Sequence, residues 1–129
     1  AHDAVDDVAY AMNTGHTDWF PLCATSDLIR DGGVVARFAG QPIALFYLPD
    51  EDPALYAVGH QDPRSEANII AHGLVGRLGG ELVVAAPLYK QHFRLSDGTC
   101  LEDDGQRLPV WPVRLENQQV LITHPVHNH

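Results

Sequence analysis

Short apolar runs recur along the chain, and turn-forming residues separate them. VVARF (34–38), IALFYL (43–48) and LYAV (55–58) are rich in β-branched and aromatic residues, which favour strands. The segments AGQP and PDEDPA stand between these runs and suit turns. The pattern therefore predicts a meander of three antiparallel strands.

Three further pairs of runs flank residues that suit tight turns. Gly79-Gly80 lies between LVGRL and ELVVAA, and glycine supplies the positive φ angles of a two-residue hairpin turn. Ser96-Asp97-Gly98 separates HFRL from TCLE, and Asn117-Gln118 separates VWPVRLE from QVLIT. Strands spaced this closely predict an all-β domain of small antiparallel sheets, arranged as a sandwich or a partly open barrel.

The flanks and one internal segment lack this strand pattern. Residues 1–16 have no hydrophobic period, so we expect a mobile extension there, followed by the domain proper at 17–123. Residues 124–129, HPVHNH, form a His-rich tail. The long irregular stretch 59–73 is expected to be functional or to cover another part of the molecule.

Composition narrows the class of protein. A chain of 129 residues with 45% hydrophobic residues suits one domain, and its net charge of −9 argues against nucleic acid as a partner. No apolar run is long enough to span a membrane, and the N-terminal AHDAVDDVAYAMN lacks the layout of a signal peptide. We therefore expect a soluble, cytoplasmic protein. Its two cysteines exclude a disulfide framework and are expected to be buried free thiols.

The chain offers no convincing catalytic or metal-ligand motif. Eight histidines invite a metal hypothesis, but the spacings of His60 with Asp62 and of Tyr89 with His92 match no recognised ligand pair. There is no Gly-x-Ser-x-Gly elbow, and the glycines of GLVGRLGG miss the dinucleotide-binding spacing. No catalytic residue is predicted.

Five stretches carry a family resemblance: IALFYL, LYAVGHQDP, AHGLVG, GGELVVAAPLYKQHFRLSDGTCLED and VWPVRLENQQVLI. They resemble the small subunits of assimilatory NAD(P)H-dependent nitrite reductases, which are members of the Rieske-like family. The resemblance implies a Rieske-like fold and an accessory role in an oxidoreductase that reduces nitrite to ammonia. It also implies that sirohaem, iron–sulfur and FAD groups belong to the large subunit, while this chain binds no cofactor and is not catalytic alone.

Rieske proteins hold a [2Fe–2S] cluster through a Cys-x-His motif in one loop and a Cys-x-x-His motif in another. When HQDPR is set against the first motif, Asp62 and Arg64 take the ligand positions. When AAPLY is set against the second, Ala86 and Tyr89 take them. The resemblance therefore implies a Rieske-like domain without a cluster.

Polar residues now occupy the two former cluster loops. We hypothesise that Asp62 joins them, either by accepting a hydrogen bond from Tyr89 or by pairing with Arg64 or Lys90. The alternative is that these charges are simply solvated, because exposed ion pairs contribute only about 0–1 kcal/mol.

The former cluster loops are also the expected docking surface for the large subunit. A local basic cluster on an acidic chain can guide docking, and arginine is enriched at interfaces. The candidate docking residues are Arg64, Tyr89, Lys90, His92 and Arg94. The competing expectation is that apolar residues on a sheet face dock instead. Two other functions stay open: a cluster-bearing Rieske-type electron-transfer ferredoxin, and a free-standing Rieske-like binding module.

Overall fold

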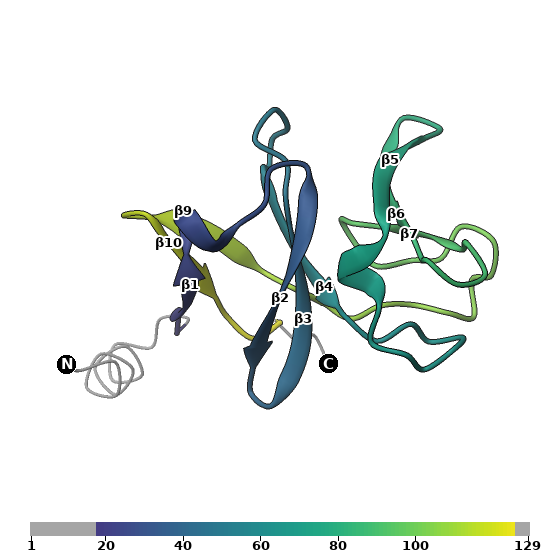
Figure 1. Cartoon of the computed structure of the whole chain (residues 1–129), viewed down its shortest axis with the longest axis horizontal. Helices are drawn as coiled ribbons and strands as arrows, with labels where there is room; N and C mark the ends of the chain where they lie inside the picture. Colours follow the sequence, from purple (N-terminus) through teal and green to yellow (C-terminus); the bar gives the residue numbers. More distant parts are fainter. Residues whose placement is uncertain (1–17, 126–129) are drawn as a thin grey trace.

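A computed structural model describes residues 18–125 (Figure 1). In this part of the chain the strands are β1 (Phe20–Ala24), β2 (Gly32–Phe38), β3 (Gln41–Tyr47), β4 (Leu55–Gly59), β5 (Leu74–Leu78), β6 (Glu81–Ala85), β7 (His92–Arg94), β8 (Val110–Trp111), β9 (Val113–Glu116) and β10 (Gln119–Ile122). Two 3-10 turns, η1 (Thr25–Asp27) and η2 (Ile70–His72), complete the regular structure.

Three small antiparallel sheets make up the domain. The sheet with strand order β2-β3-β4-β8 lies between the sheet β1-β10-β9 and the sheet β5-β6-β7 (Figure 1). None of the three closes into a barrel. The predicted all-β fold of small antiparallel sheets is confirmed, and so is the meander of β2, β3 and β4.

Strand β3 is the centre of the molecule because both of its faces are buried. Successive side chains of a strand point to opposite faces. Ile43 and Leu45 therefore enter the core shared with the β1-β10-β9 sheet, while Ala44 and Phe46 enter the core shared with the β5-β6-β7 sheet. All four residues are fully buried.

The long segment 59–73 covers part of the core that β3 shares with the β5-β6-β7 sheet. Its turn η2 places Ile70 and Ala71 against β2 and β3. Gly33 permits this close approach, since a Cβ atom at that position would lie 2.5 Å from the Ala71 carbonyl oxygen.

Three features of the strand pattern differ from the prediction. The run VWPVRLE divides at Pro112 into β8 and β9, which belong to different sheets, because proline cannot donate to a ladder. The expected strand TCLE is reduced to isolated bridges at Thr99 and Cys100. Strand β1 was not predicted; it contains Pro21 and a bulge, and it pairs with β10.

The ends of the chain contribute only in part to the described structure. His124, in the predicted tail, packs its ring against Phe38 with 4.8 Å between centroids. The predicted extension 1–16 and the tail residues 126–129 lie outside the described residues. Within residues 18–125, no helix has the length and apolar character needed to cross a membrane.

Candidate functional site

Asp62 organises the first former cluster loop, here called the first loop (residues 60–69). Its side chain is fully buried. One carboxylate oxygen accepts the backbone N–H of Arg64 at 3.0 Å, and the other accepts the hydroxyl of Ser65 at 3.1 Å. The Asp62 N–H donates to the Ala67 carbonyl at 2.8 Å, which closes the loop. These bonds satisfy a buried charge from within its own loop.

The second loop (residues 86–91) is anchored at both ends and exposed in its middle. Ala86 and Gln91 are buried, and the Ala86 N–H donates to the Gln91 carbonyl at 2.8 Å. Between them Tyr89 and Lys90 adopt left-handed φ angles of 60° and 52°. Tyr89 is 63% exposed. The loop therefore holds its middle residues out toward solvent on two buried supports.

The two loops meet through Arg64 and Tyr89. The guanidinium carbon of Arg64 lies 4.7 Å from the centroid of the Tyr89 ring, a cation–π contact. The hypothesis that Asp62 joins the loops is wrong, because its carboxylate is taken by the local donors of Arg64 and Ser65.

The four positions that the resemblance assigns to former cluster ligands fall into a buried pair and an exposed pair. Asp62 and Ala86 are 0% and 1% exposed, while Arg64 and Tyr89 face solvent. This donor set does not fit a [2Fe–2S] cluster, which needs thiolates on one iron and thiolates or imidazoles on the other. Across residues 18–125, no group of three or more His, Cys, Asp or Glu side chains is arranged to hold a metal ion. The alternative of a cluster-bearing ferredoxin therefore has no ligand set in the described part of the chain.

His92, a predicted docking residue, is held by Glu102. Its Nδ1 lies 2.7 Å from one carboxylate oxygen, and its backbone N–H donates to the other at 2.8 Å. Burial acts to raise the pKa of Glu102, but the hydrogen bonds from His92 outweigh burial and lower it. His92 therefore braces the start of β7 against the Glu102 segment.

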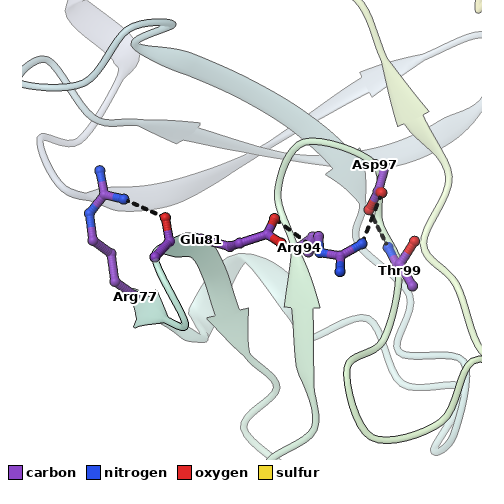
Figure 2. Close-up of polar contacts among 6 residues, drawn as sticks. Arg77, Glu81, Arg94, Asp97 and Thr99 are labelled. Atoms are coloured by element: carbon purple, nitrogen blue, oxygen red, sulfur yellow. Dashed lines mark hydrogen bonds and ion pairs between the residues drawn. The ribbon is translucent and has the colours of Figure 1, made fainter.

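Arg94, the last predicted docking residue, links β6 to the turn that follows β7 (Figure 2). It pairs with Glu81 at 3.0 Å and with Asp97 at 3.3 Å. Asp97 also accepts the backbone N–H of Thr99 at 2.9 Å. Burial acts to raise the pKa of Asp97, but the bonds from Thr99 and then Arg94 lower it. Arg94 lies opposite Val83, so it stands further from the two loops than His92 does.

His60 has a structural role beside the first loop. It is 5% exposed, and its Nδ1 accepts the Ala71 N–H at 3.1 Å, which fixes η2. Burial, and then the nearby His72, lower the pKa of His60. A neutral imidazole with Nδ1 as acceptor fits this position.

The family model of the Rieske-like [2Fe-2S] domain matches residues 18–123. The chain is also 40% identical to the nitrite reductase (NADH) small subunit of Salmonella typhimurium over 106 residues, which cover 82% of this chain and 97% of the relative. The chain belongs to this family of Rieske-like small subunits.

Two further comparisons describe the family. A solved structure described as an NADH-dependent nitrite reductase small subunit from Mycobacterium tuberculosis is 35% identical, with a TM-score of 0.77 over 86% of this chain and 98% of that one. In Klebsiella oxytoca the similar segment, 38% identical over 81% of this chain, lies in a protein named nitrite reductase [NAD(P)H] large subunit. The chain spans only 11% of that larger relative.

Sequence reasoning about this Rieske-like small subunit missed three exposed leucines near the two loops. Leu74 is 80% exposed, Leu88 48% and Leu101 38%. Leu74 and Leu101 belong to or border strands, where apolar residues are ordinarily assigned to a core. The strand pattern alone does not tell which face of the β5-β6-β7 sheet is covered.

Proposed function

We propose that the chain is the accessory subunit of an NAD(P)H-dependent nitrite reductase and assembles with the large subunit in the cytoplasm. The observation that carries this proposal is the match to small subunits over 97% of their length. The match therefore spans nearly the whole length of those relatives. The accessory role is supported by the names of these relatives, which are small subunits of nitrite reductase (NADH).

The Klebsiella relative supports assembly with the large subunit. There the segment similar to this chain is part of the polypeptide named large subunit. Covalent linkage raises the effective concentration of two units, so it favours units that work in contact. We infer that separate chains achieve the same contact through a specific interface.

The redox groups of the complex belong to the partner in this proposal. Reduction of nitrite to ammonia with electrons from a nicotinamide requires carriers, and sirohaem, iron–sulfur and FAD groups are expected on the large subunit. The small subunit then supports assembly or stability of the large subunit, without passing electrons itself.

Among the charged docking residues that were predicted, two pair with carboxylates of this chain and two have no such partner in the described residues. His92 and Arg94 are engaged with carboxylates of this chain, at 2.7 Å from Glu102 and 3.0 Å from Glu81. In the described residues, Arg64 and Lys90 have no carboxylate within the 4.0 Å of an ion pair. We propose that Arg64 and Lys90 supply the charged contacts to the large subunit, beside Tyr89.

A charge-reversal experiment tests this assembly. The double variant Arg64→Glu/Lys90→Glu is titrated against the large subunit by calorimetry. Its matched control is Arg37→Glu/Arg114→Glu, two exposed arginines on β2 and β9. Arg37 has no carboxylate partner among the described residues, and Arg114 pairs with the half-exposed Glu116 at 3.1 Å. Both variants change the net charge of −9 by the same amount, two reversals of two units each.

The Arg64→Glu/Lys90→Glu variant is expected to lose about 2–5 kcal/mol of binding free energy where its cations become buried and paired, and far less where they stay at a solvated rim. The control is expected to keep native affinity apart from a small, salt-sensitive effect. Circular dichroism checks that each variant folds. If the folded Arg64→Glu/Lys90→Glu variant binds with native affinity, the proposal that these residues contact the large subunit is wrong. If the unmodified chain does not bind the large subunit, the proposed assembly itself is wrong.

A further inference from the structure

One row of side chains crosses the outer face of the β5-β6-β7 sheet at the end nearest the two loops. Leu74 is opposite Ala85, and Ala85 is opposite His92. The Leu101 N–H donates to the His92 carbonyl at 2.8 Å, which extends the row. The next row, including Val84 and Phe93, points to the opposite face and lies in the core. Because faces alternate along a strand, the row that begins at Leu74 faces outward.

The second loop adds two more exposed apolar side chains beside this row. Leu88 and Tyr89 are 48% and 63% exposed, and the loop begins directly after Ala85. We call Leu74, Leu88, Tyr89 and Leu101 the apolar tip patch. These four residues are half of the eight exposed large hydrophobic residues found in the described part of the chain. Such clustering marks an interaction surface more often than scattered exposed residues do.

The backbone of the second loop maintains this exposure under strain. Tyr89 and Lys90 are consecutive residues in the left-handed region, which glycine adopts freely and side-chain-bearing residues rarely adopt. Two buried ends and the Ala86–Gln91 hydrogen bond hold them there. Strained conformations of this kind concentrate at binding and switch regions.

We propose that the apolar tip patch is the centre of the interface with the large subunit, which meets it with an apolar surface bordered by carboxylates. This inference rests on the proposed function. Among the described residues Arg64 and Lys90 have no ion-pair partner, and they line a hollow at the patch with Tyr89, Glu102 and Asp103. A partner complementary to these two cations carries carboxylates opposite them. An apolar centre with a charged rim is the usual anatomy of a protein interface.

A second copy of this chain fits the same surface less well. A two-fold contact brings the same patch of both copies together, so Arg64 and Lys90 of both copies would gather at one contact. The carboxylate of Glu102, which lines the same hollow, is already held by His92 at 2.7 Å, so the like charges of the two copies oppose this contact. A different partner chain does not repeat these cations.

The test compares two pairs of exposed apolar residues. Leu74→Ser/Leu88→Ser removes part of the apolar tip patch, and Val35→Ser/Leu115→Ser is the matched control, with exposed fractions of 48% and 40% away from the two loops. Each variant is titrated against the purified large subunit at low and at high salt. Burial of each leucine predicts roughly a tenfold loss or more, so the tip variant is expected to bind about a hundredfold more weakly at both salt concentrations. The control is expected to bind within about threefold of the unmodified chain.

Four outcomes decide the inference. Weak binding by the folded leucine variant at both salt concentrations, with a normal control, supports it. Native affinity of the leucine variant would overturn the inference, and it would leave the proposed function intact if Arg64→Glu/Lys90→Glu still binds poorly. No binding by the unmodified chain would overturn the proposed function as well. A dimer of the unmodified chain in sedimentation that dissociates in the leucine variant would assign the patch to a second copy and overturn the inference.

Discussion

Replacing Asp62 with alanine tests whether a buried carboxylate organises the first loop. The substitution removes the acceptors of the Arg64 N–H at 3.0 Å and of the Ser65 hydroxyl at 3.1 Å. Hydrogen bonds to a charged group contribute about 1.5–3 kcal/mol each, so the gross loss is roughly 3–6 kcal/mol. Part of this loss is offset because a buried charge no longer has to be desolvated. We expect a net destabilisation of about 2–4 kcal/mol.

The assay is urea unfolding followed by circular dichroism, together with thermal unfolding. For a domain of this size about 1 kcal/mol corresponds to roughly 4 °C, so Asp62→Ala is expected to lower the midpoint by about 8–16 °C. Asp62→Asn keeps an oxygen for the Arg64 N–H and is expected to lose about half as much stability.

Asp27→Ala is the matched control for this substitution. Its carboxylate accepts the Ala24 N–H at 3.0 Å, but it does so at the surface, so the expected loss is about 0.5–1 kcal/mol. If Asp62→Ala unfolds at the same urea concentration as Asp27→Ala, the carboxylate does not organise the first loop and the reasoning fails.

Three further predictions concern the cluster, the pH dependence and a glycine. The purified chain is expected to bind no iron–sulfur cluster after anaerobic reconstitution, because the former ligand positions offer no thiolate; stoichiometric iron and sulfide would contradict this. Because the pKa of His60 is lowered in the folded state from its usual 6.5, the unfolded chain binds more protons. The contribution of neutral His60 to folding stability is therefore fully present above about pH 6.5, and it is lost as the pH drops toward the folded-state pKa. The urea midpoint of His60→Gln should fall less over this pH range than that of the unmodified chain. Gly98→Ala is expected to destabilise by about 3 kcal/mol or more, since Gly98 has a φ of 79° and a Cβ there would overlap the Leu108 carbonyl oxygen. Gly76→Ala, with no atom within 4 Å of the added Cβ, is expected to be nearly neutral in the same denaturation assay.

Local signals explain why much of the fold was predictable. The hairpin turn at Gly79-Gly80 was predicted because glycine supplies positive φ, and the turn at Asn117-Gln118 because two strand runs flank it. All four residues adopt positive φ. The meander of β2, β3 and β4 followed from short apolar runs separated by turn residues. Such signals act within a few neighbouring residues, so no knowledge of distant contacts is required.

The candidate site was predictable only in part. The family resemblance assigned Asp62, Arg64, Ala86 and Tyr89 to the former ligand positions, but the sequence did not reveal which of them contact one another. The Asp62 carboxylate accepts hydrogen bonds within its own loop because a buried carboxylate requires donors. The nearest donors belong to residues two and three positions further along the chain. Arg64, whose guanidinium does not share those bonds, could then reach Tyr89.

By itself the sequence determined the all-β class and most hairpin turns, because these depend on residue type and local order; the assignment of the former ligand positions came from the family resemblance. Only the tertiary structure decided the pairing of β1 with β10, the division of VWPVRLE between two sheets and the outward face of Leu74. Those features depend on which surfaces are already covered by distant segments. A strand pattern shows that two faces exist, and packing across the whole chain selects the one that is buried.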